Sequence, residues 1–299
     1  MAAQTGEIRI GVGGWTFEPW RETFYPRGLP QAKELAHLSR ALTAIEINGT
    51  FYRTQTPATF AKWRDETPEG FVFTVKAPRY AVNRTDLTAG ADSIARFVDS
   101  GLGELGPKLG PILWQFAPTK KFARDEIAGF LDLLPERAGG LRLRHALEAR
   151  HESFRDPAFV DLARARGAAI VLAADGAYPQ FADPTADFAY ARIMGTQEDE
   201  PLGYAPADLD RWAAQARGWA AGGVGEGLAL AGPAPKSVPP RDVFLFVISG
   251  FKPRNPLAAQ ALIARLSAPA GAKAAPPKAA KGAPPKAKKK APRKGAAKA

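Results

Sequence analysis

The stretch IRIGVGG at residues 8–14 starts the pattern that decides the fold, because a short apolar run there closes on a glycine-rich cluster. Seven further apolar runs follow in order up to residue 248, and most of them close on polar side chains. These runs are TAIEI (43–47) with Glu46 and Asn48, FVFTV (71–75) with Lys76, PILW (111–114) with Gln115, RHALEA (144–149) with Glu148, Arg150 and His151, AAIVLAA (168–174) with Asp175, DFAYARI (187–193) with Arg192, and DVFLFVI (242–248) with Ser249. Eight strands with polar residues at their carboxyl ends are typical of a (β/α)₈ barrel whose site lies on the carboxyl-terminal face.

Helical patterns alternate with these runs. Residues 31–42 place leucines on one face at spacings of three and four. Thr56, Asp156 and Asn255 each precede a proline, which is a typical start of a helix, whereas residues 174–186 leave little room for one. Alternating strands and helices predict an α/β protein with a parallel sheet and exclude a sandwich or a helical bundle. An open doubly wound sheet is the alternative, but eight strands favour a closed, TIM-like barrel.

Length and composition favour one barrel in a soluble protein. Residues 7–266 match the roughly 250 residues of a typical barrel. The chain has no cysteine, which excludes disulfides and a cysteine nucleophile and suits the cytosol. Its first ten residues lack the features of a signal peptide, and no apolar run approaches the roughly 20 residues that span a bilayer. We therefore expect a cytoplasmic protein that does not enter a membrane.

Positive charge is concentrated in one segment. The net charge is +11, but residues 268–299 hold ten Lys or Arg and no acid, which leaves 31 basic and 30 acidic residues elsewhere. This segment contains only Ala, Pro, Gly, Lys and Arg, so it has no large apolar side chain to bury and is predicted to be a disordered tail. Its cations favour weak, salt-sensitive, nonspecific binding to nucleic acid. A solubilising tail without a partner is the alternative.

Five motifs resemble those of one protein family. They are GVGGWTFEPWRETFYP (11–26), EINGTFYR (46–53), FVFTVKAPRY (71–80), LGPILWQFAP (109–118) and EARHESF (148–154). Together they resemble the YecE-like family, the domain of unknown function 72, over about residues 8–266. The resemblance implies a barrel related to the TIM fold and leaves the biochemical activity open.

The chain departs from the family pattern at several positions. Val82 and Asn83 stand where the family often has Thr-His, Ser249 stands where Asn is frequent, and Phe154 stands where Trp is common. Loss of that histidine argues against a mechanism that needs its imidazole, and it is consistent with an altered substrate or with lost activity. The family residues that are present are Glu46, Asn48, Tyr52, Lys76, Gln115, Glu148, Arg150 and His151.

Two glutamates are the predicted acid–base pair. Glu46 and Glu148 end the second and fifth strands, and two carboxylates can divide the roles of general acid and base when their environments separate their pKa values. His151 titrates near neutrality and is predicted to assist the proton transfer. The alternative is structural: Glu46 pairs with Lys76, Glu148 pairs with Arg150, and His151 binds a loop carbonyl.

Further side chains near the mouth of the barrel are predicted to bind the substrate. Cationic groups after the third, seventh and eighth strands favour an anionic group, with salt bridges between loops as the alternative. Aromatic residues after the first two strands could stack on a ligand or pack the floor of the pocket. The predicted substrate-binding residues are Trp15, Asn48, Tyr52, Lys76, Gln115, Arg150 and Arg192.

No cofactor is implied by the sequence. The GVGG stretch at residues 11–14 is not a GxGxxG dinucleotide fingerprint. A divalent metal held by Glu46, Glu148, His151 and Asp175 is an alternative on the chemistry of those side chains. Against it, the chain contains neither HExxH nor paired histidines.

Three functions remain from these observations. The leading hypothesis is an enzyme, a hydrolase or an isomerase, that uses acid–base chemistry on a small anionic or hydroxylated substrate at the carboxyl-terminal face. The second is a nucleic-acid-associated protein whose basic tail binds without sequence preference. The third is a barrel that binds a small ligand without converting it.

Overall fold

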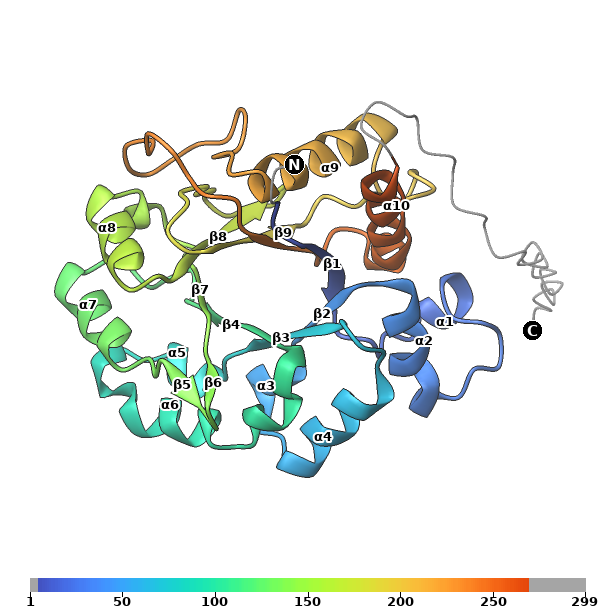
Figure 1. Ribbon diagram of the computed structural model, residues 1–299, viewed down its shortest axis with the longest axis horizontal. Coiled ribbons are helices and arrows are strands. Elements are labelled where there is room, and N and C mark those ends of the chain that lie inside the picture. The colour runs from blue at the N-terminus through green and yellow to red at the C-terminus, as the bar shows by residue number, and fades with distance from the viewer. Residues whose placement is uncertain (1–4, 269–299) are drawn as a thin grey trace, which may run out of the picture.

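Eight parallel strands follow the eight apolar runs and close into a barrel. The computed structural model describes residues 5–268. The barrel strands are β1 (Ile8–Gly13), β2 (Ala44–Ile47), β3 (Val72–Lys76), β4 (Leu109–Gln115), β7 (His145–Glu148), β8 (Ala169–Ala174), β9 (Phe188–Ile193) and β10 (Asp242–Val247). Their order is β1-β10-β9-β8-β7-β4-β3-β2, and pairing of β10 with β1 closes the ring (Figure 1). The predicted (β/α)₈ barrel is confirmed, and the open sheet is excluded.

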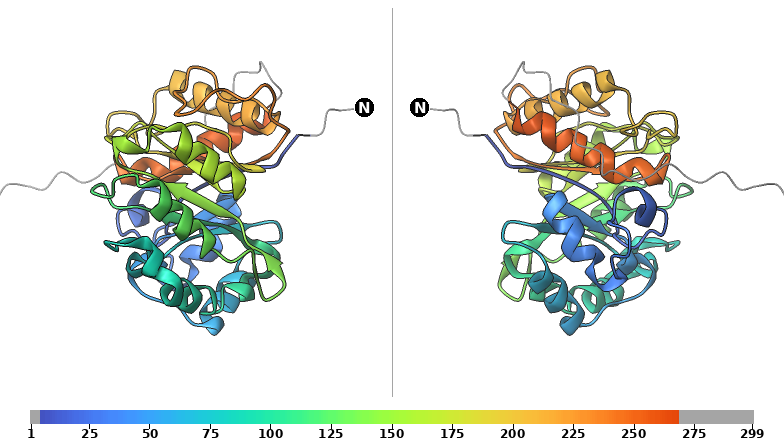
Figure 2. Two further views of the ribbon diagram at one scale, coloured as in Figure 1. Left: turned by 90° about the vertical axis from the view of Figure 1, so that its left-hand side faces the viewer. Right: turned by 90° about the vertical axis from the view of Figure 1, so that its right-hand side faces the viewer.

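Helices surround the strands in Figure 1, and the two opposite side views of Figure 2 show them on the outside of the barrel. The helices are α1 (Trp20–Thr23), α2 (Glu34–Ala41), α3 (Gly49–Tyr52), α4 (Pro57–Glu66), α5 (Arg79–Val82), α6 (Ala91–Val98), α7 (Arg124–Asp132), α8 (Pro157–Ala165), α9 (Pro206–Ala220) and α10 (Asn255–Ser267). Residues 175–187 join β8 to β9 without a helix, as expected from the short connection.

Two of the three predicted helix caps are confirmed. Thr56 and Asp156 each accept a hydrogen bond from a backbone N–H in the first turn of α4 and α8. The prediction for Asn255 is wrong, because Asn255 is the first residue of α10 and its side chain caps nothing. Its amide is buried and binds Thr196 Oγ1 at 2.8 Å and the Val247 carbonyl at 3.3 Å. A buried amide must find partners, and here they lie at the ends of neighbouring strands.

Side chains of the strands alternate between two apolar layers. The larger layer lies between the strands and the helices. The smaller layer fills the inside of the barrel with the rings of Phe188, Tyr190, Phe244 and Phe246 among others. Toward the carboxyl ends of the strands the inward side chains become polar. Apolar side chains therefore fill the barrel below its mouth. The inward polar side chains described below lie at the mouth.

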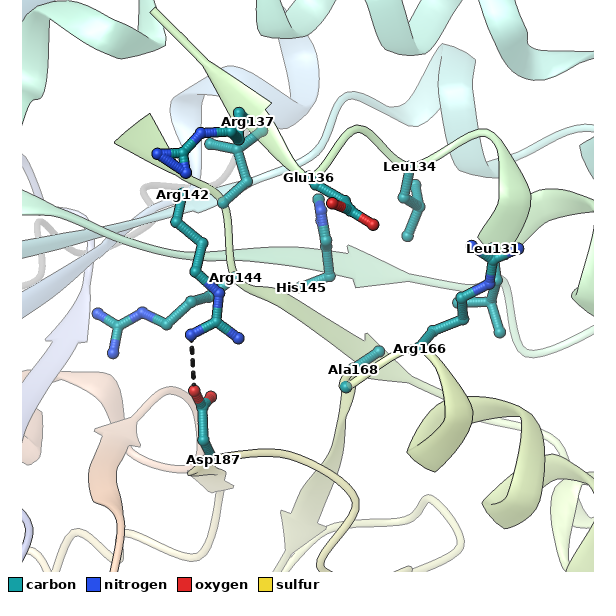
Figure 3. A pocket seen from close by; sticks show the side chains of 12 residues that line it. Leu131, Leu134, Glu136, Arg137, Arg142, Arg144, His145, Arg166, Ala168 and Asp187 are labelled. Carbon is teal, nitrogen blue, oxygen red and sulfur yellow. Dashed lines mark hydrogen bonds and ion pairs between the residues drawn. The ribbon is translucent and has the colours of Figure 1, made fainter. Parts of the chain in front are cut away.

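A hairpin lies at the opposite, amino-terminal end of the barrel. Its strands β5 (Arg137–Ala138) and β6 (Leu141–Arg142) pair antiparallel, and its turn uses Gly139 and Gly140 at positive φ. With the end of α7 and the starts of β7 and β8, the hairpin borders a cavity of about 330 Å³ that is lined by several arginines (Figure 3). This hairpin was not predicted from the sequence.

Among residues 5–268, no helix is long and apolar enough to cross a membrane. The basic tail predicted for residues 268–299, and with it the predicted binding of nucleic acid, lies outside the described residues except for Ala268. The division into a barrel domain over residues 7–266 and a tail therefore stays a prediction, as does the location in the cytoplasm.

Candidate functional site at the barrel mouth

Two glutamates meet at one arginine inside the mouth. Glu46 on β2 and Glu148 on β7 are 0% exposed, and Arg192 on β9 is 2% exposed. Arg192 donates from Nε and Nη2 to the two oxygens of Glu46, at 3.0 Å each, and from Nη1 to Glu148 Oε2 at 2.7 Å. Because an isolated charge is very costly to bury, these three side chains depend on one another and form one unit.

Neighbouring donors complete the coordination of both carboxylates. The Tyr190 hydroxyl donates to Glu46 Oε2 at 2.8 Å. Gln115 Nε2 donates to Glu148 Oε2 at 2.8 Å, and Arg150 Nε donates to Glu148 Oε1 at 2.7 Å. Every oxygen of the two carboxylates therefore accepts at least one hydrogen bond. The contact between Arg150 and Glu148 that the structural alternative predicts is therefore present.

The surrounding charges keep Glu148 ionised. Burial alone would raise the pKa of Glu148, but the positive charges of Arg192 and Arg150 outweigh burial and lower this pKa below its ordinary value. The pKa of Arg192 would be lowered by burial, yet the charges of Glu148 and Glu46 raise it. Glu148 and Arg192 consequently carry fixed opposite charges at neutral pH.

Lys76, at the end of β3, is the titratable group that this network leaves free. It is 8% exposed, and its Nζ makes no ion pair or hydrogen bond with the described residues. The ammonium lies over the Phe51 ring, 4.1 Å from the centroid. Burial and then the charge of Arg192 lower the pKa of Lys76 to about 8, although both nearby glutamates oppose the shift. The alternative in which Glu46 pairs with Lys76 is wrong, because Arg192 takes that carboxylate.

Two residues of the cluster were not predicted from the sequence. Tyr190 binds Glu46, and its hydroxyl lies 3.0 Å from Thr74 Oγ1. Thr74 precedes Lys76 by two positions, and Tyr190 precedes Arg192 by two. Since side chains two apart on a strand share a face, the same alternation that places Lys76 and Arg192 in the mouth would have identified both.

A loop residue joins the site from outside the strands. The guanidinium of Arg150 lies 4.1 Å from the ring centroid of Tyr178 and donates to its hydroxyl at 3.3 Å. Tyr178 belongs to the irregular connection after β8, where no local pattern points to a contact. The stacked ring holds Arg150 beside Glu148.

His151 and Tyr52 make no hydrogen bond to the cluster. The Nδ1 atom of His151 accepts from the backbone N–H of Ser153 at 3.1 Å, which caps a short 3₁₀ turn over residues 152–154. Tyr52, on α3, is 71% exposed. The predicted roles of these two side chains stay predictions.

Trp15 and Asn48 lie beside the mouth without a direct bond to the two carboxylates. Trp15 packs edge-on against Trp63, with ring centroids 5.0 Å apart, which fits the packing alternative for the aromatic residues. The Asn48 amide nitrogen lies against Gly13, only 2.6 Å from where a Cβ at this position would stand. Glycine at the end of β1 thus makes room for the Asn48 side chain.

The carboxylates of the metal alternative are bound by other side chains. Glu46 and Glu148 share Arg192, whereas Asp175 accepts hydrogen bonds from Trp212 at 2.9 Å and from Tyr204 at 3.2 Å. Among the residues that the structure describes, no three or more histidines and carboxylates are grouped so that they could hold a metal ion.

Comparisons with known proteins point to one family. A family model with the description "Protein of unknown function DUF72" matches residues 9–281. UPF0759 protein YunF of Bacillus subtilis (strain 168) is 29% identical over 159 residues, which cover 52% of this chain and 54% of YunF. UPF0759 protein YecE of Escherichia coli (strain K12) is 27% identical over 150 residues, with 49% and 50% covered. The chain thus spans about half the length of these curated relatives.

A solved structure supports the fold. The crystal structure of a DUF72 family protein from Thermotoga maritima superposes with a TM-score of 0.61 at 20% identity, covering 86% of this chain and 97% of that chain. At this identity the likeness concerns the fold alone.

Proposed function

The chain belongs to the DUF72 family, and from the geometry of its barrel mouth we propose that it is an enzyme that transfers a proton to and from a small anionic or hydroxylated substrate. The site is the carboxyl-terminal mouth, where barrels of this architecture carry their catalytic residues.

The state of Lys76 is the observation that carries this proposal. The side chain is nearly buried and has no carboxylate partner among the described residues, and its pKa is lowered to about 8. An amine with a pKa near the working pH is suited to accept and return a proton. A lysine that served only as a structural cation would gain from a salt bridge, and both neighbouring glutamates are committed to arginines instead.

Charge balance favours an anionic group on the substrate. Glu46 and Glu148 offset Arg192 and Arg150, so protonated Lys76 adds one positive charge that nothing in the cluster neutralises. A negatively charged substrate supplies the missing negative charge. Because the side chains of the site are buried, its attraction to protonated Lys76 is weakly screened. In this proposal the carboxylates hold the arginines in place, and Lys76 exchanges the proton.

A thermal-shift screen of the full chain tests the proposal. The panel contains small 2-oxo acids, hydroxy acids and sugar phosphates, against the native chain and Lys76→Met. A ligand at a hundred times its Kd stabilises the native chain by roughly 2.7 kcal/mol. Lys62→Met is the matched control, because Lys62 on α4 is 65% exposed and pairs with Glu66 at the surface.

We expect a ligand whose stabilising effect is lost in Lys76→Met and kept in Lys62→Met. Conversion of that ligand should then increase as the pH rises toward about 8, since the lowered pKa of Lys76 frees the amine in that range. The proposal fails if no compound binds the native chain, or if binding is the same in Lys76→Met.

A further inference from the structure

We propose that Lys76 attacks the carbonyl group of a small aldehyde or 2-oxo acid and holds it as an imine. This inference rests on the proposed function and names the substrate class of the same site. It assigns the neutral amine of Lys76 the part of a nucleophile, so that the proton transfer of the proposed function acts on the bound substrate.

The surroundings of the amine leave it ready to react. Most lysine nitrogens lie in water or in a salt bridge, and both arrangements keep the amine protonated. Lys76 makes no salt bridge with the described residues, its side chain is 8% exposed, and its Nζ lies over the face of the Phe51 ring. Burial, and then the charges of Arg192 and Arg150, lower the pKa of Lys76 despite the opposing charges of Glu46 and Glu148, so more of the amine is in the neutral, nucleophilic form than in an ordinary lysine.

An anionic group next to the carbonyl has a binding partner in the same place. Arg150 uses Nε for Glu148 and Nη1 for Tyr178, while its Nη2 makes no hydrogen bond with the described residues. Its charge is close enough to act on Lys76. A carboxylate or phosphate bound by Arg150 would place an anionic substrate in the same mouth as the amine, and a short 2-oxo acid carries both the anionic group and a carbonyl.

The covalent step balances without any redox partner. The neutral amine adds to the carbonyl carbon, the C–O double bond opens, and a proton moves from nitrogen to oxygen to give a carbinolamine. The hydroxyl then takes one proton from the solvent and leaves as water, and the nitrogen lone pair forms the C=N bond. The product is a protonated imine plus one water, so no oxidant or reductant is consumed.

The protonated imine suits the charges of the mouth. It carries the single positive charge that the ammonium of Lys76 carried, so the balance against Glu46 and Glu148 is unchanged. It also withdraws electrons from the adjacent carbon and makes a proton there easier to remove. An imine at this position therefore activates that carbon, and while the imine lasts another group in the mouth takes the proton in place of Lys76.

Reductive trapping tests this inference on the full chain. Glyoxylate or pyruvate is added at neutral pH with sodium cyanoborohydride, which reduces imines to stable secondary amines, and the modified lysines are located by peptide mass spectrometry. We expect Lys76 to be labelled roughly tenfold or more faster than exposed Lys62, because a far larger fraction of Lys76 is uncharged at that pH.

Two variants separate chemistry from folding. Lys76→Met removes both the amine and the charge, whereas Lys76→Arg keeps a cation that cannot form an imine. Both should lose the rapid label, and Lys62→Arg should keep it. Labelling of Lys76 no faster than Lys62 would overturn the imine. If a ligand still binds in a Lys76-dependent way without trapping, the imine alone is wrong, and if neither occurs, the proposed function fails as well.

Discussion

The two ends of the barrel bring together the same kinds of charged side chain but bury them differently. At the mouth, Arg192 and its two glutamates have side chains that are 3% and 0% exposed, with contacts of 2.7–3.0 Å. At the opposite end, Arg142 pairs with Asp187 at 2.8 Å, with side chains 65% and 53% exposed (Figure 3). The bond lengths are alike, so the two ends differ mainly in contact with water.

Water decides what each pair contributes to stability. An exposed pair contributes about 0–1 kcal/mol, because solvent screens it and replaces either partner. Removing one partner of a buried pair costs about 3–5 kcal/mol, because the other charge remains in a dry interior. The mouth is thus a fixed framework of charges, whereas the opposite end tolerates substitution. Four predictions test this contrast, in order of expected effect.

Arg192→Met should have the largest effect. It leaves two buried carboxylates without their shared guanidinium, and we expect the free energy of unfolding to fall by about 3–5 kcal/mol. Urea denaturation of the native chain and the variant measures this difference. A change below about 1 kcal/mol would mean that the ion pairs of the mouth contribute no more to stability than the exposed pair at the opposite end.

The second effect appears as a dependence on pH. The unfolded chain protonates Lys76 at its ordinary pKa of 10.5, whereas the folded chain does so at about 8. Between these values the unfolded state binds more protons, so this lysine makes stability rise with pH. Relative to Lys76→Met, the native chain should gain about 3 kcal/mol from pH 8 to pH 10.5. Urea denaturation at several pH values tests this gain, with Lys62→Met as control, and parallel curves would refute it.

Tyr190→Phe should have a smaller effect. The change keeps the ring that fills the inside of the barrel and removes only the hydroxyl that donates to Glu46. Loss of one hydrogen bond to a buried charge should cost about 2 kcal/mol. Thermal unfolding of the variant gives the value, and an effect as large as that of Arg192→Met would mean that Tyr190, and not the arginine, holds Glu46.

Arg142→Ala should have the smallest effect. Its exposed pair with Asp187 predicts a loss of about 0.5 kcal/mol or less. The same urea experiment compares it directly with Arg192→Met. A loss of several kcal/mol would show that the hairpin depends on this arginine and would remove the contrast between the two ends.

Local patterns explain why the fold could be predicted. The eight apolar runs and the alternation of strand side chains are visible over a few residues, and they locate Glu46, Lys76, Gln115, Glu148 and Arg192 at strand ends. The choice of partners is not local, because Glu46 and Arg192 are 146 positions apart. Whether Glu46 meets Lys76 or Arg192 depends on how the ring closes.

The incorrect and missing predictions have different origins. Asn255 precedes a proline and looks like a cap, but Thr196 and the Val247 carbonyl take its amide in the folded barrel. The β5–β6 hairpin depends on two glycines at positive φ between short, polar strands, which carry no apolar run. His151 follows the end of β7 by three residues, and its contact with Ser153 depends on the turn that begins there.

The closure of the ring by β1 and β10 also has a consequence for synthesis. Ile8 pairs with Val243, so β1 cannot form this pairing until β10 has been synthesised. At about 5–20 residues per second this delay lasts on the order of ten to fifty seconds. During that time one edge of IRIGVG has no native neighbour, and an unpaired apolar edge is a template for wrong pairing. Until β10 has been made, the free edge of the first strand is therefore a place where a wrong strand can pair.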